Sequence, residues 1–197
     1  MSKADHQHLV IFAKQPRPGT VKTRLAAAIG TARATQIYRN LLDRTIRQAA
    51  CDPRWTTWLA LNPDNAAIDN APWQGMVDGK LAQGRGDLGD RMGRVFENMP
   101  RGPVVIIGSD LPQLRRAHIA AAFDALGNHD LVLGPAEDGG YWLIGHQRRP
   151  YRRGLFDRVR WSSPTTLADT LDNAGGQSVA ILDCLRDLDT VDDLDLL

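Results

Sequence analysis

Short apolar runs alternate along this chain with longer stretches of helical periodicity. The apolar runs lie at residues 9–13, 58–61, 104–108, 131–133, 141–144 and 179–182. They are continuous rather than broken by polar residues at every second position, which is typical of strands covered on both faces. The helical stretches lie at residues 22–29, 87–99, 114–126 and 163–174, together with a longer one that Thr31 is expected to cap. Strands that alternate with helices predict a three-layer α/β/α fold around a mostly parallel, mixed sheet.

The composition indicates one domain over residues 1–197 with no strong overall charge. The 24 Lys and Arg residues nearly balance the 23 Asp and Glu residues, so no global field favours nucleic acid or an anionic membrane as a partner. Cys51 and Cys184 lack metal-ligand spacing, which favours reduced, structural cysteines in a cytoplasmic protein. The apolar run before Lys14 is too short for a signal segment or a membrane span. The sequence leaves the oligomeric state open.

A basic loop at residues 14–24 (KQPRPGTVKTR) directly follows the first predicted strand. It contains no acidic residue, and its cations are Lys14, Arg17, Lys22 and Arg24. In open α/β sheets, ligands bind at the carboxyl ends of strands, where the next helix presents free N–H groups to anions. Gly19 allows a close approach of the backbone, so the loop predicts a site for nucleotide phosphates, with a solvated basic loop as the alternative. A Walker P-loop is excluded because Val21, and not Gly, precedes Lys22.

Carboxylates are expected in the same crevice. Asp110 follows the most apolar predicted strand, where its oxygens would hold Mg²⁺ or Mn²⁺ against bound phosphates. The alternative is that Ser109 or Asp110 caps the following helix. In the acidic C-terminal segment, Asp187 and Asp189 can turn back over the crevice, and Asp189 is the stronger candidate for a second metal ligand. The same segment predicts a terminal helix capped by Thr190.

Two glycine-rich segments complete the candidate site. Residues 135–145 (PAEDGGYWLIG) predict either a simple hairpin turn, which their spacing favours, or an edge that binds an acceptor molecule. The acceptor-edge candidates are Glu137, Asp138, Gly139, Gly140 and Tyr141. Gln83 precedes residues 84–89 (GRGDLG), which either approach a base or ribose or form an ordinary loop and helix start.

Six ordered segments of the chain resemble the glycosyltransferase-like family called radical-SAM/selenodomain-associated transferase 1. They are residues 12–25 (FAKQPRPGTVKTRL), 88–92 (LGDRM), 108–112 (GSDLP), 134–145 (GPAEDGGYWLIG), 161–163 (WSS) and 187–194 (DLDTVDDL). That family is similar to the nucleotide-diphospho-sugar transferases of GT-A fold, which include molybdenum-cofactor guanylyltransferase and phospholactate guanylyltransferase. The resemblance implies phosphate binding by the four cations of the basic loop and metal binding by Asp110 and Asp189. It also favours the acceptor edge, at residues 137–141, over the simple turn.

Three functions are consistent with these features. The first is Mg²⁺-dependent nucleotidyl transfer, in which a phosphorylated small-molecule acceptor attacks the α-phosphorus of a nucleoside triphosphate and Lys22 and Asp110 are catalytic. The second is glycosyl transfer from a nucleotide-diphosphate sugar, in which Glu137 or Asp138 activates an acceptor hydroxyl. Four cations on one loop suit a triphosphate and favour the first. The third is a nucleotide-binding regulatory module, which would tolerate the loss of Asp110.

Overall fold

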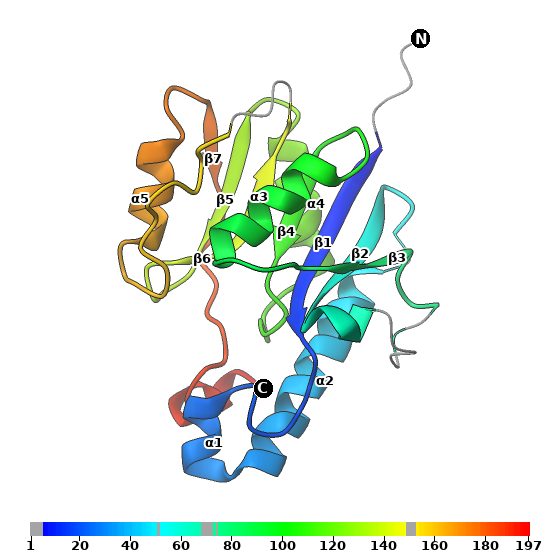
Figure 1. The fold of residues 1–197 in the computed structure, drawn as a ribbon, viewed down its shortest axis with the longest axis vertical. Helices are drawn as coiled ribbons and strands as arrows, with labels where there is room; N and C mark the ends of the chain where they lie inside the picture. The colour runs from blue at the N-terminus through cyan, green and yellow to red at the C-terminus, as the bar shows by residue number, and fades with distance from the viewer. Residues whose placement is uncertain (1–5, 51, 68–72, 74, 149–152) are drawn as a thin grey trace.

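The computed structural model describes residues 6–50, 52–67, 73, 75–148 and 153–197. Its centre is a seven-stranded sheet with the strand order β3-β2-β1-β4-β6-β5-β7 (Figure 1). The strands are β1 (Gln7–Lys14), β2 (Trp55–Asn62), β3 (Gly79–Ala82), β4 (Val104–Ile107), β5 (Leu131–Pro135), β6 (Tyr141–His146) and β7 (Val179–Ile181). All pairings are parallel except those of β6, which runs antiparallel to β4 and β5. The predicted mostly parallel, mixed sheet is therefore confirmed.

Helices cover both faces of the sheet. The α-helices are α1 (Thr23–Ile29), α2 (Thr31–Ala49), α3 (Leu88–Asn98), α4 (Arg116–Ala125) and α5 (Thr166–Asn173), and the 3₁₀ helices are η1 (Asp64–Ala67) and η2 (Val191–Leu196). In β1, Leu9 and Ile11 pack in the core with α2 and α4, whereas Val10 packs in the core with α3 and α5. All three side chains are fully buried, so the continuous apolar run of β1 reflects burial on both faces.

A small lobe extends beyond the carboxyl end of β1. It consists of α1, the first half of α2 and the C-terminal η2, which share a separate apolar cluster of Leu25, Ala34, Leu41 and Leu188. In Figure 1 this lobe lies below the sheet, with the C-terminus beside α1. Packing within this lobe therefore places the acidic C-terminal segment beside the basic loop, as the sequence predicted.

The strand β3 was not predicted from the sequence. Its four residues (GKLA) follow a stretch rich in Pro, Asn and Asp and form a half-exposed edge strand, so no apolar run marks it. The glycine at its start has a packing role: a Cβ on Gly79 would lie 2.4 Å from the ring of Trp58. Burial of that indole thus accounts for Gly79.

Some element boundaries differ from those predicted. The N-cap of α2 is Gly30 (φ 86°), so Thr31 is the first helical residue and not the cap. Helix α5 begins at Thr166 rather than Ser163, because the intervening residues form a turn in which the Thr166 N–H donates to the Ser163 carbonyl at 3.1 Å. The predicted terminal helix is the 3₁₀ helix η2, capped by Thr190. Cys51 lies outside the described residues, and Cys184 is free and exposed. None of the helices in the described ranges is both long and apolar enough to span a bilayer.

Candidate active site

The basic loop leaves β1 at Lys14 and is anchored at both ends. The Gln15 N–H donates to the Asn62 carbonyl at 2.8 Å, and Val21 is buried in the main core. Between these anchors, Arg17 and Gly19 are exposed, and Gly19 has the positive φ of 79° that glycine adopts without strain. The tip of the loop is thus open to a ligand while its two ends are fixed.

Lys22 points inward and contacts both predicted metal ligands. Its Nζ donates to Asp110 Oδ2 at 2.6 Å and lies 3.7 Å from Asp189 Oδ1. Only 6% of its side chain is exposed, and its backbone has φ 48° and ψ 48°, a left-handed conformation that costs a non-glycine residue about 1 kcal/mol. Burial acts to lower the pKa of Lys22, but the Asp110 carboxylate outweighs it, and the pKa is raised. Lys22 is therefore a fixed ammonium ion.

The C-terminal segment surrounds this ammonium ion with carboxylates. Asp189 Oδ2 accepts a hydrogen bond from Arg24 Nη1 at 2.9 Å. The Leu188 N–H donates to the Asp110 carbonyl at 3.1 Å and fixes the segment beside Asp110. Asp187 lines the adjacent pocket, where burial and the nearby Asp110 raise its pKa. The structure thus brings together Lys22, Arg24, Asp110 and Asp189, and it places Asp187 at the adjacent pocket, as expected for a C-terminal segment that turns back over the crevice.

Tyr38 connects the basic loop to the Asp110 loop, and its role was missed by sequence reasoning. Its hydroxyl accepts a hydrogen bond from the Lys14 N–H at 2.9 Å and lies 3.0 Å from Ser109 Oγ and 3.2 Å from the Lys14 carbonyl. Burial raises the pKa of Tyr38 to about 12, so the phenol is neutral at physiological pH. In the sequence, the one available signal was a tyrosine within the apolar face of the helix after Thr31.

The capping alternative for Asp110 is not observed. The N-cap of α4 is Arg115, and Ser109 contacts Tyr38 instead. Both predicted ligands, Asp110 and Asp189, supply the carboxylate oxygens that Mg²⁺ and Mn²⁺ prefer, and both already face one cation, the Lys22 ammonium. Within the described ranges, no group of three or more His, Cys, Asp or Glu side chains is arranged to hold a metal ion. The donors fit a divalent ion whose remaining ligands would come from phosphates and water.

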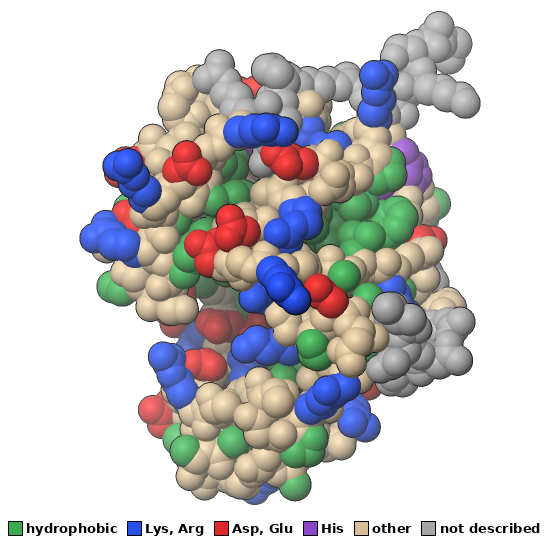
Figure 2. Space-filling model, in the orientation of Figure 1, with side chains coloured by type: hydrophobic (Ala, Val, Ile, Leu, Met, Phe, Trp, Pro, Cys, Tyr) green, Lys and Arg blue, Asp and Glu red, His purple; other side chains and the backbone are tan. Residues whose placement is uncertain are grey.

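A pocket of about 210 Å³ opens beside Asp110. Its lining combines carboxylates, aromatic residues and hydroxyls from the loop after β4, from β6 and the turn before it, from the starts of α3 and α5, from the turn before α5 and from the C-terminal segment. The described residues that form it are Leu88, Gly108, Asp110, Leu111, Ala136, Asp138, Gly140, Tyr141, Trp142, Trp161, Ser162, Ser163, Thr166 and Asp187. In Figure 2, acidic and basic side chains gather around the hollow between the α1 lobe and the rest of the molecule.

The turn before β6 is both a tight turn and part of the pocket wall, and its predicted contact with an acceptor stays a prediction. It is a tight turn, in which the Ala136 N–H donates to the Gly140 carbonyl at 3.0 Å and Asp138 Oδ1 accepts from the Gly140 N–H at 2.9 Å. It also presents Asp138, Gly140 and Tyr141 to the pocket, whereas Glu137 is exposed and lies 3.7 Å from Arg186. Gly139 (φ 86°) packs on the turn before α5, where a Cβ would lie 2.2 Å from the Pro164 carbonyl oxygen.

Gln83 lies apart from the pocket. Its Nε2 donates to the carbonyls of Ala13 and Ala60 at 3.1 and 2.9 Å, and the residue is only 5% exposed. In the structure it links the ends of β1 and β2 behind the basic loop. Its predicted contact with a nucleotide stays a prediction.

Comparison with known proteins identifies the family of this chain. The profile of the family described as "Uncharacterized protein conserved in bacteria (DUF2064)" matches residues 45–163, more than half of the chain. The chain belongs to this family. The matched residues of this DUF2064 chain include Asp110 and the turn before β6, whereas the basic loop and the C-terminal carboxylates lie outside them. No functionally curated protein matches the sequence.

Solved structures resemble the DUF2064 chain over nearly its whole length. A "putative nucleotide-diphospho-sugar transferase" from Desulfovibrio desulfuricans G20 is 28% identical, with a TM-score of 0.84 over 94% of this chain and 83% of that one. The inositol-1-phosphate CTP transferase from T. maritima is 11% identical, with a TM-score of 0.57 over 96% and 91% of the two chains. The manganese complex of Rv0371C from Mycobacterium tuberculosis H37Rv is 22% identical, with a TM-score of 0.52 over 98% of both chains. These similarities confirm the predicted fold of the nucleotide-diphospho-sugar transferases and support a transferase.

Proposed function

We propose that this protein is a Mg²⁺-dependent nucleotidyltransferase, which moves a nucleotidyl group from a nucleoside triphosphate to a small-molecule acceptor. From the sequence we expected a phosphorylated acceptor of the kind used by the guanylyltransferases that the chain resembles. The observation that carries the proposal is the pairing of the basic loop with Asp110 and Asp189 at the carboxyl end of β1. A fixed ammonium ion, two arginines and Lys14 at this edge suit the charge of a triphosphate.

Each group of the site has a defined part in this function. Exposed Lys14, Arg17 and Arg24 would bind the phosphates. Lys22 is held by Asp110 and is almost inaccessible to solvent. Its ammonium group would neutralise the charge that develops on the leaving pyrophosphate. Asp110 and Asp189 are the residues that would hold a divalent ion, which when bound supplies charge neutralisation and orients the phosphates. Preorganised charges of this type accelerate phosphoryl chemistry mainly by positioning the reactants and neutralising charge.

Glycosyl transfer from a nucleotide-diphosphate sugar is the second candidate, and one observation favours it. Asp138 lines the pocket beside Asp110, where its carboxylate is placed to accept a proton from an acceptor hydroxyl. The manganese bound by Rv0371C is compatible with either reaction, whereas the CTP named for the T. maritima transferase is a nucleoside triphosphate, the donor type of the first reaction.

The products distinguish the two reactions. The protein is incubated with Mg²⁺ and panels of nucleoside triphosphates and sugar nucleotides, and pyrophosphate and nucleoside diphosphate are quantified. Nucleotidyl transfer releases pyrophosphate, whereas glycosyl transfer releases the diphosphate. Asp110→Asn should abolish either release, while Arg47→Gln, an exposed charge at the far end of α2, should leave it unchanged. Turnover that survives Asp110→Asn would contradict the assigned site.

A further inference from the structure

We propose that the pocket beside Asp110 binds a ring-shaped acceptor that carries hydroxyl groups and no phosphate, such as a sugar or a cyclic polyol. This inference rests on the proposed function only in taking the nucleotide to bind at the basic loop. It replaces the phosphorylated acceptor expected from the sequence, because the charges of the pocket oppose a second phosphate group.

The charge of the pocket is the first observation. Beside Asp110, which is paired with Lys22, Asp138 and Asp187 contribute two further carboxylates, and none of the described residues that line the pocket is Lys, Arg or His. The nearest ammonium ion, that of Lys22, is already 2.6 Å from Asp110 and almost fully buried. Placing like charges side by side in a binding site costs several kcal/mol, so a phosphate in this pocket would be strongly disfavoured. Hydroxyl groups would instead donate charge-assisted hydrogen bonds to the same carboxylates.

The crevice is therefore divided by charge. Lys14, Arg17 and Arg24, where donor phosphates would bind, are exposed to solvent and do not line the pocket. The pocket itself presents carboxylates. Arg186, the nearby cation of the C-terminal segment, is directed to Asp193 at 2.5 Å and to Glu137 at 3.7 Å. The donor and the acceptor would thus approach Asp110 from sides of opposite charge.

The shape of the pocket is the second observation. Tyr141, Trp142 and Trp161 contribute aromatic residues to its lining, and Leu88 and Leu111 contribute aliphatic ones. The pocket thus combines apolar residues with polar carboxylates and hydroxyls. A saturated ring with equatorial hydroxyls matches this combination, since its C–H faces are apolar and its edge is polar. A volume of about 210 Å³ is below the usual range for drug-sized ligands, which suits a single ring.

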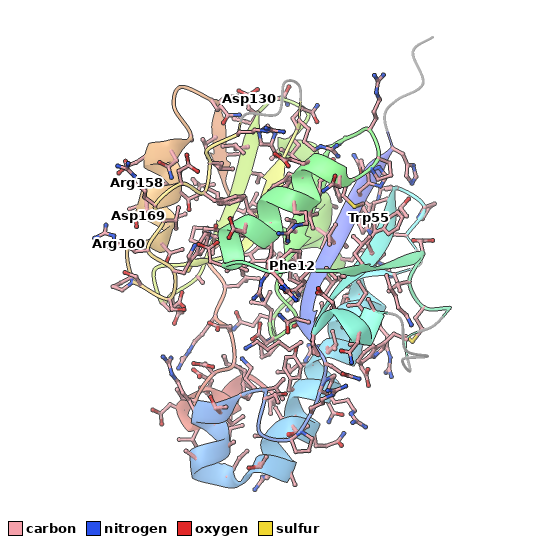
Figure 3. All side chains as sticks on the ribbon, viewed as in Figure 1. Phe12, Trp55, Asp130, Arg158, Arg160 and Asp169 are labelled. Carbon is pink, nitrogen blue, oxygen red and sulfur yellow. The ribbon has the colours of Figure 1, made fainter. Side chains whose placement is uncertain are left out.

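The aromatic wall is held in place before any ligand binds. Arg160 donates to Asp169 through Nε at 2.9 Å and Nη2 at 2.6 Å, which fixes the turn before α5 (Figure 3). Trp161 packs so closely on α3 that a Cβ on Gly89 would lie 2.7 Å from its ring. Ser162 follows in a left-handed conformation with φ 54° and is exposed at the pocket. A preformed wall lowers the entropic cost of binding a small ring.

The chemical step balances with either donor. An acceptor hydroxyl attacks the α-phosphorus of a nucleoside triphosphate, a new P–O bond forms, and the bond to the departing pyrophosphate breaks. With a sugar nucleotide, the hydroxyl oxygen bonds to the anomeric carbon and the nucleoside diphosphate leaves. In both cases the hydroxyl proton passes to the Asp138 carboxylate and then to water.

Ligand-observed saturation-transfer NMR on the full chain tests the class of acceptor. The probes are matched pairs, each a neutral sugar or cyclic polyol and its monophosphate, with glucosamine as a cationic member. We expect neutral and cationic members to bind at least tenfold more tightly than their phosphorylated partners. Tighter binding by the phosphorylated members, or binding by no neutral member, would overturn the proposal.

Two variants locate the binding. Trp161→Leu should weaken binding of the neutral ring at least tenfold without changing nucleotide affinity, and a nucleotide affinity that falls in parallel would contradict the division of the crevice. Asp138→Asn should narrow the difference between neutral and phosphorylated probes, whereas Asp172→Asn, an exposed carboxylate change on α5, should leave it unchanged. Nucleotide binding is measured separately by thermal shift. Loss of nucleotide binding with retained ring binding would refute the proposed function and leave this inference standing.

Discussion

Replacing Tyr38 by Phe removes the hydroxyl that joins the basic loop to the Asp110 loop. The residue is 4% exposed, and its hydroxyl lies within 3.2 Å of the Lys14 N–H, the Lys14 carbonyl and Ser109 Oγ. The substitution leaves the Lys14 N–H without this acceptor in a buried setting, which costs about 1–3 kcal/mol. We therefore expect the free energy of unfolding to fall by that amount. Nucleotide affinity should fall as well, because binding must then order a looser loop.

Urea denaturation followed by circular dichroism measures the first effect, and titration calorimetry with a nucleoside triphosphate measures the second. Tyr141→Phe is the matched control, since that hydroxyl is buried near Thr170 and away from the basic loop. The control should keep the nucleotide affinity of the original chain. A Tyr38→Phe protein whose stability stays within about 0.5 kcal/mol of the original, and whose nucleotide affinity is unchanged, would refute the linking role.

Three further changes test separate parts of the structure. Lys22→Met leaves the Asp110 and Asp189 carboxylates without their ammonium partner, so urea denaturation in EDTA should show a loss of up to about 3 kcal/mol that Mg²⁺ partly restores; equal stability in EDTA would contradict this. Gly139→Ala places a Cβ against Pro164 at a positive φ and should cost about 1–3 kcal/mol by the same measurement, and a neutral effect would refute the close packing. Burial lowers the pKa of His146 to about 4 from 6.5, so its stabilising effect is complete above pH 6.5 and is lost as the pH falls toward 4. Between pH 7 and pH 5 we expect it to contribute a loss of about 2 kcal/mol, which should be missing in His146→Gln.

Much of the fold was predictable because burial on both faces leaves a clear pattern in the sequence. The runs that became β1 and β4 are continuously apolar, since Leu9, Val10 and Ile11 are each buried on one face or the other. The strand β3 was not predictable in this way, because an exposed edge strand of four residues needs no apolar run. The helix boundary at Thr166 was missed for a different reason: Ser163 resembles an N-cap but instead accepts a hydrogen bond that closes a turn.

The site residues were predictable where a charged side chain directly follows a predicted strand or lies in a segment with a distinctive charge. The basic loop and Asp110 follow predicted strands, and Asp189 lies in a segment whose charge stands out; the structure brings Lys22 and Arg24 of the loop into contact with these carboxylates. Tyr38 could not be identified, because a tyrosine on an apolar helix face has the same pattern whether its hydroxyl is used or not. The separation between the cations of the basic loop and the carboxylates of the pocket could not be predicted from the sequence either. It depends on which carboxylates the tertiary fold places in the pocket lining.

The central claim is that the basic loop and Asp110 form a site for a nucleotide. Thermal unfolding of the original protein and of Lys22→Met, each with nucleoside triphosphates, nucleoside diphosphates and sugar nucleotides in Mg²⁺ and in EDTA, tests it most directly. At about one hundred times its dissociation constant, a bound nucleotide should stabilise the original protein by about 2.7 kcal/mol, and Lys22→Met should lose most of that gain. If no nucleotide stabilises the original protein, with or without Mg²⁺, the claim is contradicted.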